Sequence, residues 1–365
     1  MKRGYAYILI LILGLLVWRC DNNLISESGG SDNPDDTAAN DKWLIPREKV
    51  YDGGPGKDGI PSIDEPEFLP VDQVDYLNEN DLVLGLKQGD KTKAYPHRIL
   101  DWHEIVNDKA GNRNVAVTYC PLTGTGIAWN REINNKTTTF GVSGLLYKNN
   151  LIPYDRATDS YWSQMLNQSI HGEHIKTKAE TFQLIETTWS TWKSMYPGSR
   201  VLSTQTGYDR NYRVYPYGDY KETAELIFPV DTLDERLFLK KRVLGLTGGD
   251  QTKAYQFKDF SDSVHIVGDT LNDEHYIIIS SQKSNFLVAY KNQLQEGNKG
   301  NFQLEPLQDQ LPLVMKDQQG NRWNIFGEAV AGPEKGEKLQ RANAFIGYWF
   351  AWSSFYPDIK IYNEP

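Results

Sequence analysis

Cys120 is the first of two residues in the first half of the chain that we single out as candidates for nucleophilic, redox or metal chemistry. It lies in Val117-Thr-Tyr-Cys-Pro-Leu-Thr-Gly-Thr-Gly126, where an alternating strand is expected to run into a tight, glycine-rich loop. Unpaired backbone N–H groups in such a loop would favour the thiolate form. The alternative is an inert core cysteine, because free cysteine is among the most buried residue types.

His103 is the second such residue. We expect a helix from Pro96 to about Asn107, with His103 on its inner face beside Ile99, Trp102 and Val106. From there the imidazole could orient or deprotonate Cys120. The alternative is a buried histidine that holds a backbone carbonyl group.

The same two residues also suit a soft metal ion. A thiolate and an imidazole are ligands for copper or zinc, and Met165 or His171 could complete the set. The spacing of Cys120 and His103 matches no standard zinc pattern. A copper or zinc site is therefore one of several interpretations of these residues.

A dense polar and aromatic set follows between residues 140 and 165. Its candidate ligand-binding members, together with Thr123 of the cysteine loop, are Ser143, Asp155, Arg156, Ser160, Trp162 and Gln164. Arg156 or Gln164 could bind a substrate, and the alternative is an Asp–Arg clamp on a long loop. A serine nucleophile is disfavoured, because Gly-Val-Ser143-Gly lacks the G-x-S-x-G spacing.

The chain contains one phrase twice, which separates candidate site residues from scaffold. Val83-Leu-Gly-Leu-Lys-Gln-Gly-Asp-Lys-Thr-Lys-Ala-Tyr95 returns 160 residues later as Val243-Leu-Gly-Leu-Thr-Gly-Gly-Asp-Gln-Thr-Lys-Ala-Tyr255. The second copy has Val264 at the position of His103, lacks the cysteine, and is expected to keep only Phe326-Gly327 of the polar set. We therefore predict a duplicated protein with its site in the first copy.

The expected fold is α+β and rich in β-strands. Strands are predicted over 81–86, 91–95 and 114–120, with a turn at Gly89-Asp90. A hairpin is predicted from 126–132 and 137–142 around Asn134-Asn135. A second helix is predicted over 182–196, because Phe182, Ile185, Trp189, Trp192 and Tyr196 recur at steps of three and four.

The first residues resemble a targeting element. Lys2 and Arg3 precede an apolar stretch over 5–18, then Cys20 and a polar run. This layout predicts a bacterial lipoprotein lipidated at Cys20, anchored to the membrane and lying outside the cytoplasm in the cell envelope. An uncleaved anchor is the alternative, because Arg19 replaces the small residue expected before the cysteine.

Length and charge set further bounds. The 365 residues carry a formal net charge of −9, which repels phosphate backbones and argues against nucleic-acid binding. We expect an anchor over 1–20, a tether over 21–44, a first unit with the site over 45–215, and a second, structural unit over 216–365. With Cys20 lipidated, Cys120 is the only thiol left, so an internal disulfide is excluded.

Several segments in order resemble one family. Gly53-Gly-Pro-Gly-Lys-Asp-Gly-Ile-Pro-Ser-Ile-Asp64, Trp102-His-Glu-Ile-Val-Asn107, Thr118-Tyr-Cys-Pro-Leu-Thr-Gly124 and Asp155-Arg156…Trp162-Ser-Gln164 are similar to the DUF3179 family, over roughly Tyr51 to Tyr362. The resemblance implies a grouping of unknown function. Relatives often show Cys-Pro-Leu-Cys, so Thr123 removes the resolving thiol that a dithiol cycle would need.

Three functions therefore remain open from the sequence. The first is a thiol-centred site and the second a copper or zinc site, both at Cys120 and His103. The third is a non-catalytic envelope module that binds a small molecule or protein, with Cys120 structural.

Overall fold

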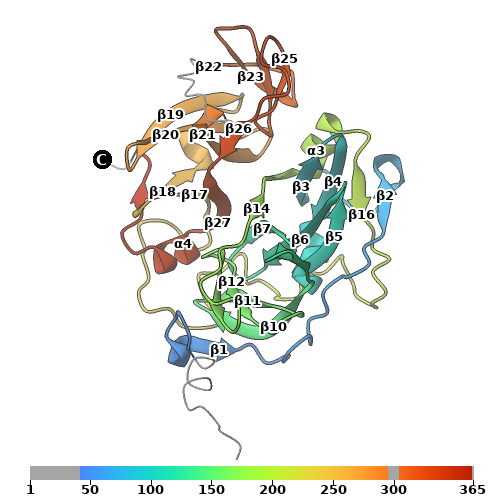
Figure 1. The fold of residues 1–365 in the computed structure, drawn as a ribbon, viewed down its shortest axis with the longest axis vertical. Coiled ribbons are helices and arrows are strands. Elements are labelled where there is room, and N and C mark those ends of the chain that lie inside the picture. Colours follow the sequence, from blue (N-terminus) through green and yellow to red (C-terminus); the bar gives the residue numbers. More distant parts are fainter. Residues whose placement is uncertain (1–41, 295–303, 364–365) are drawn as a thin grey trace, which may run out of the picture. The chain divides into compact units, whose positions relative to one another are not determined.

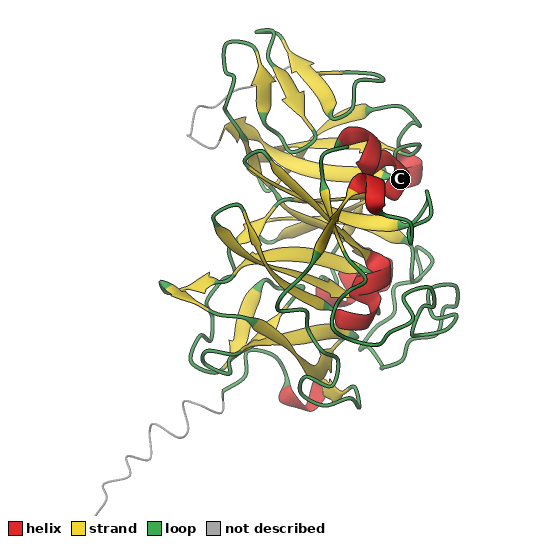
Figure 2. Ribbon diagram, turned by 90° about the vertical axis from the view of Figure 1, so that its right-hand side faces the viewer, coloured by secondary structure: helices red, strands yellow, loops and turns green. Residues whose placement is uncertain are grey.

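The computed structural model describes residues 42–294 and 304–363. Residues 40–365 belong to one compact unit, and strands dominate while the helices are short (Figures 1 and 2). The β-rich α+β class expected from the sequence is thus confirmed. No helix in the described ranges is long and apolar enough to cross a membrane. The expected anchor with Cys20, and most of the tether, lie outside the described residues.

The first half of the described chain builds three main sheets. The first has the order β15-β3-β4-β16-β2, formed by Leu184–Thr188, Leu82–Gln88, Lys91–Pro96, Arg200–Leu202 and Phe68–Pro70. The second has the order β14-β7-β6-β5, formed by Thr181–Phe182, Thr125–Asn130, Arg113–Cys120 and Ile105–Ala110. The third has the order β1-β10-β11-β12-β13, formed by Val50–Asp52, Phe140–Tyr147, Asn150–Asp155, Tyr161–Ser163 and Gln168–His171.

Short elements complete this half. They are the helices α2 and α3, His97–His103 and Trp189–Met195, the 3-10 turns η1 and η2, Arg47–Lys49 and Val71–Gln73, and the ribbon β8-β9, Glu132–Ile133 and Lys136–Thr137. Residues 203–241, which connect the two halves, contain only turns and bends.

The second half also builds three sheets. The first has the order β27-β17-β18-β28, formed by Asn343–Tyr348, Arg242–Gly248, Gln251–Gln256 and Lys360–Ile361. The second, β19-β20-β21-β26, consists of His265–Leu271, Glu274–Ser281, Phe286–Leu294 and Leu339–Arg341. The third, β22-β23-β24-β25, consists of Leu304–Pro306, Leu313–Asp317, Arg322–Asn324 and Ala329–Ala331. The helix α4 is Trp349–Phe355 and the turn η3 is Phe257–Asp259.

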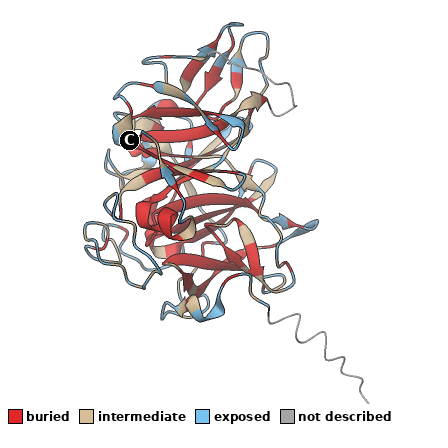
Figure 3. Cartoon of the chain, turned by 90° about the vertical axis from the view of Figure 1, so that its left-hand side faces the viewer, coloured by how far each residue is buried: buried red, intermediate tan, exposed pale blue. Residues whose placement is uncertain are grey.

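The apolar cores cross the boundary expected at residue 215, whereas each sheet in the described ranges takes its strands from one half. One cluster of buried side chains contains Trp129 and Trp162 together with Trp349 and Trp352, and another contains Trp192 with Trp323. Figure 3 shows this burial concentrated in the strands, with exposure in the connecting loops. The halves therefore stabilise each other through shared side-chain packing.

The predicted helix from Pro96 to Asn107 is too long. α2 ends at His103, because Glu104 has a positive φ of 57°, which is incompatible with a right-handed helix. The β-branched residues Ile105 and Val106 then start β5, which pairs with β6. The strand predicted over 114–120 is confirmed as β6.

The second predicted helix is likewise right only in its later part. α3 starts at Trp189, where the Thr188 hydroxyl accepts a hydrogen bond from the Thr191 N–H. The preceding residues form β15, which pairs along the whole length with β3. Tertiary strand pairing thus overrides the helical spacing of Phe182 and Ile185.

The hairpin expected around Asn134-Asn135 exists only as the short ribbon β8-β9. Both asparagines have positive φ values, 49° and 62°, as a tight hairpin turn requires. The longer flanking strands separate, since β7 pairs with β6 and β14 while β10 pairs with β1 and β11. The turn was predicted correctly and the strand pairing was not.

Candidate functional site

Glu104 is the most unusual titratable residue of the first half. It follows the last residue of α2 in a left-handed conformation, with φ at 57°, and its side chain is buried. Burial raises the pKa of its carboxyl group to about 8, an effect that nearby Asp101 increases. Among the described residues, the one hydrogen bond to its carboxyl group is donated by the Tyr217 hydroxyl, at 3.5 Å from Oε1. The Glu104 carboxyl group is therefore mostly protonated at neutral pH, and its hydrogen-bonding capacity is only weakly satisfied.

Glu104 lines a cavity of about 240 Å³. The other walls are apolar. They come from residues 51–66 (the lead segment), residues 120–126 (the cysteine loop), β10 and β11, and residues 203–241 (the connector). The principal side chains are Pro55, Ile60, Leu122, Leu151, Tyr217 and Phe228. A few convergent polar groups in an apolar hollow are typical of a small-molecule site. Three of the segments that carry the family resemblance meet here, around one carboxyl group.

The lead segment is fixed to β10 by its backbone. The Gly53 N–H donates to the Gly144 carbonyl at 2.7 Å, and the Asp58 N–H donates to the Val142 carbonyl at 2.8 Å. A Cβ atom on Gly144, where φ is 79°, would lie 2.7 Å from the Gly56 carbonyl oxygen. Only glycine therefore allows this wall of the cavity to close.

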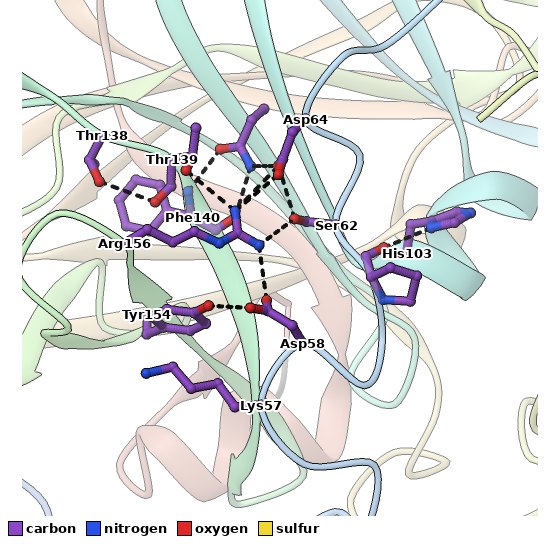
Figure 4. Close-up of polar contacts among 12 residues, drawn as sticks. Lys57, Asp58, Ser62, Asp64, His103, Thr138, Thr139, Phe140, Tyr154 and Arg156 are labelled. Carbon is purple, nitrogen blue, oxygen red and sulfur yellow. Dashed lines mark hydrogen bonds and ion pairs between the residues drawn. The ribbon is translucent and has the colours of Figure 1, made fainter. Parts of the chain in front are cut away.

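Arg156 holds the same segment from its outer side (Figure 4). Its guanidinium group donates to Asp58 at 2.9 Å, to Ser62 at 3.0 Å and to Asp64 at 3.2 Å. Tyr154 donates a further hydrogen bond to Asp58. Since the guanidinium is occupied by these acceptors, it acts as a clamp, as the alternative interpretation of this loop predicted, with Asp58 and Asp64 as partners.

The connector forms the roof of the cavity. The side chain of Asn149 clasps the backbone of Phe228, accepting from its N–H at 2.9 Å and donating to its carbonyl at 2.7 Å. Ile227, beside it, lines the cavity and is 48% exposed. The Asn149 side-chain amide thus fixes this irregular part of the connector at the opening of the cavity.

Cys120 lies next to this site but is closed off from solvent, with 1% of its surface exposed. Burial, and to a smaller extent the Glu104 carboxylate, raise the pKa of its thiol to about 11, against the lowering effect of hydrogen bonds from Thr123 and the Leu151 backbone. The thiol donates to the Asn149 carbonyl at 3.5 Å. The expected N–H groups are thus present, but the expectation that they make the thiolate the favoured form is wrong, because desolvation is the larger effect.

His103 does not meet Cys120. Its Nδ1 lies 2.7 Å from the Pro61 carbonyl oxygen and its Nε2 lies 2.7 Å from the Tyr212 hydroxyl. Both ring nitrogens are occupied, and burial lowers the pKa of the imidazole. His103 therefore supports the lead segment through a backbone carbonyl, which is the alternative stated for it from the sequence (Figure 4).

A buried polar network lies beneath the cysteine loop. Gln164 is its centre, since its Oε1 accepts from Thr125 at 2.6 Å and from Asn150 at 2.8 Å, while its Nε2 donates to Thr118 at 2.9 Å. Thr123 belongs to it through Thr125, at 2.8 Å between the hydroxyl oxygens. The members satisfy one another, so Gln164 and Thr123 position the loop and do not face a ligand.

The second half has different residue types at the positions that correspond to this network. Cys120 pairs with Thr125 across β6 and β7, and Ser281 pairs with Phe286 across β20 and β21. Two residues before Cys120 stands Thr118, and two before Ser281 stands Ile279. The corresponding positions of the second half therefore carry apolar side chains where the network has hydroxyl groups.

Asp155 and Trp162 form a scaffold contact. The Trp162 Nε1 donates to Asp155 at 3.0 Å, and the second half contains a matching bond at 2.9 Å from Trp323 to Asp317. The expectation that the second half keeps only Phe326-Gly327 of this region is therefore wrong. A contact present in both halves marks the fold and not a site of the first half.

The two candidate serines also have local roles. Ser143 donates to the Ile152 carbonyl across the irregularity between β10 and β11. Ser160 accepts from the His174 N–H at 3.0 Å. Both are buried and bonded to the chain, so neither faces the cavity as a ligand-binding group.

The suggested metal ligands are not gathered. No group of three or more His, Cys, Asp or Glu residues that could hold a metal ion occurs in the described ranges. His171 stacks on Trp43, with ring centroids 4.5 Å apart, and Met165 belongs to the apolar core. The geometry therefore gives a copper or zinc site no support.

Gly124 joins the cysteine loop to the second half. Its φ is 62°, and a Cβ atom there would lie 2.8 Å from the Tyr348 ring. The Tyr348 N–H also donates to the Thr123 carbonyl at 2.7 Å. The loop beside Glu104 is thus held by contacts from the far half of the chain.

Sequence reasoning overlooked Glu104, Tyr217 and Asn149. Glu104 had a usable signal, because the second half has His265 where Glu104 precedes Ile105. The connector also carries four tyrosines between residues 212 and 220. Asn149 left no comparable signal, since its role depends on where the connector returns.

Fold and site together define a β-rich α+β protein with an apolar cavity that contains one buried carboxyl group. A family model described as "Protein of unknown function (DUF3179)" matches residues 57–359, and the chain belongs to this family. Neither a curated protein nor a solved structure matches the chain.

Proposed function

We propose that this protein is a binding module for a small, largely apolar ligand, which occupies the Glu104 cavity while Cys120 has a structural role. The observation that carries the proposal is the meeting of three family segments around one cavity of about 240 Å³ with a single buried carboxyl group. An apolar cavity of about 150 Å³ binds benzene in another protein. The ligand expected here is a substituted ring or branched chain of roughly ten non-hydrogen atoms.

The burial of Cys120 and the occupied nitrogens of His103 favour this function over a thiol-centred site. A nucleophile must reach its substrate as a thiolate, and this thiol is shielded with a raised pKa. The cavity, in contrast, already has walls, a roof and one polar group.

The test is ligand-observed NMR with toluene on the full chain. Ile60 is partly buried and lines the cavity, so Ile60→Trp should fill it and abolish the saturation-transfer signal. Val330→Trp, at an exposed position of the second half, is the matched control and should leave the signal unchanged. A toluene signal that survives in Ile60→Trp would contradict the proposed site.

We also infer that the two halves arose by internal duplication. Support comes from paired features at offsets of about 160 residues, such as the hydrogen bonds of Tyr95 to Asp108 and of Tyr255 to Asp269, both 2.6 Å long. A lipid anchor at Cys20 and a location in the cell envelope remain part of the proposal, on the sequence pattern of the first residues. Globomycin-sensitive processing and its loss in Cys20→Ser would test the anchor.

A further inference from the structure

Buried carboxyl groups in this protein almost all have strong partners. Within the described ranges there are six such residues: Asp101, Glu104, Asp108, Asp155, Glu186 and Asp317. Asp101 is paired with Lys221, Asp108 with Lys93 and Glu186 with Arg242. Asp155 and Asp317 each accept several hydrogen bonds from neighbouring donors.

Glu104 is the exception. No Lys, Arg or His in the described part of the chain forms an ion pair with it, and its one hydrogen bond is the 3.5 Å contact from Tyr217. A buried carboxyl group without a partner is costly, so such groups are normally paired. Because Glu104 lines the cavity, the missing partner can come from a ligand there.

The aromatic groups of the connector indicate the charge of that partner. The Lys221 ammonium lies 3.9 Å from the centroid of the Tyr215 ring, and the Lys240 ammonium lies 3.4 Å from that of Tyr220. Tyr217, between these two tyrosines, lines the cavity and carries no such cation among the described residues. The aromatic residues Tyr217 and Phe228 both line the cavity together with Glu104, and aromatic rings attract organic cations.

We propose that the ligand of the Glu104 cavity is an organic ammonium ion, a small apolar amine whose cationic nitrogen pairs with the Glu104 carboxylate. This inference rests on the proposed function and names its ligand class. The apolar walls take the hydrocarbon body of the amine, and the net charge of −9 raises the concentration of cations near the protein. A neutral ligand would need no carboxylate, because an amide or hydroxyl side chain could serve it equally well.

Binding is coupled to a proton. At neutral pH Glu104 carries its proton, and the amine carries one as R–NH3+. When the ion pair forms, the Glu104 O–H bond breaks and its proton passes to the solvent, so one proton is released for each ammonium bound. The titratable groups around Glu104 are Asp101 on α2, Cys120 at the end of β6 and Tyr217 on the connector.

The experiment is isothermal titration calorimetry on the full chain at pH 7, with benzylamine, benzyl alcohol and toluene as probes. Titrations in phosphate and in HEPES, which differ in ionisation enthalpy, give the number of protons released. We expect benzylamine to bind at least ~10-fold more tightly than benzyl alcohol, as a charge-assisted hydrogen bond implies, with nearly one proton released. Glu104→Gln should remove both the preference for benzylamine and the proton release, while Glu65→Gln, at an exposed position, should change neither.

The outcomes separate the two proposals. If toluene binds but benzylamine binds no more tightly and releases no proton, the ammonium inference is overturned and the binding module stands. If no probe binds, both are overturned. Should Glu104→Gln fail to fold, the proton count of the unmodified protein decides the question by itself.

Discussion

Replacing Glu104 by Gln should remove a pH-dependent cost to the stability of the fold. Burial raises the pKa of Glu104 from 4.5 to about 8, so between these values the folded chain keeps a proton that the unfolded chain has released. The folded state then binds more protons than the unfolded state, and stability falls as pH rises. Integrated from pH 5.5 to pH 8, the loss is about 3 kcal/mol.

Glutamine resembles the protonated acid in shape and does not titrate. The free energy of unfolding of Glu104→Gln, measured by urea denaturation, should therefore rise relative to the unmodified chain by about 3 kcal/mol between pH 5.5 and pH 8. Titrating groups that do not interact with Glu104 are present in both proteins, so their effects cancel in the difference, whereas the interaction with Asp101 is part of the measured effect. Glu65→Gln, at an exposed position, should follow the unmodified chain at both pH values. A difference between Glu104→Gln and the unmodified chain that changes by less than about 1 kcal/mol over this range would refute the burial argument.

Three further predictions concern the cysteine loop and its supports. Gly124→Ala should lower the free energy of unfolding by about 3 kcal/mol in urea denaturation, because the added Cβ atom clashes with an aromatic ring and the backbone is left-handed. Gly218→Ala, where φ is 61° and the space is open, should lower it by only about 1 kcal/mol. Equal losses of stability in the two variants would show that crowding by the ring is unimportant. In a Cys20→Ser background, the Cys120 thiol should react with Ellman's reagent at pH 7 at least ~100-fold more slowly in the folded chain than in urea, and equal rates would mean that the thiol is accessible. Gln164→Leu should cost about 3 kcal/mol in denaturation, since it leaves several buried polar groups without partners, and a cost below 1 kcal/mol would show that the network relaxes.

Local pattern was a good guide wherever the chain pairs with near neighbours. The strands β3, β4 and β6 and the Asn134-Asn135 turn follow from alternation and turn residues, which act over a few positions. The second predicted helix was wrong where pairing with a distant strand competes with helix formation. Ile185 has helical spacing to Trp189 but pairs with β3, about a hundred residues earlier. Periodicity alone does not contain that competition.

The same distinction between local pattern and tertiary structure applies to the candidate site. The comparison of the two copies drew attention to Cys120 and His103, and His103 precedes Glu104, which lines the cavity. It did not anticipate the surroundings of these two residues, because residue type does not reveal that Pro61 and Tyr212 occupy the imidazole or that burial raises the pKa of the thiol. Burial and partners are properties of the assembled chain.

The sequence by itself determined the β-rich class, the family segments and the repeated phrase, because these depend on residue type and spacing. Only the tertiary structure decided that Glu104 is the buried acid, that Arg156 and His103 are supports, and that the connector returns through Asn149 to roof the cavity. The physical reason is that a pKa and a cavity arise from desolvation by side chains far apart in sequence, and no local pattern records which of them will meet.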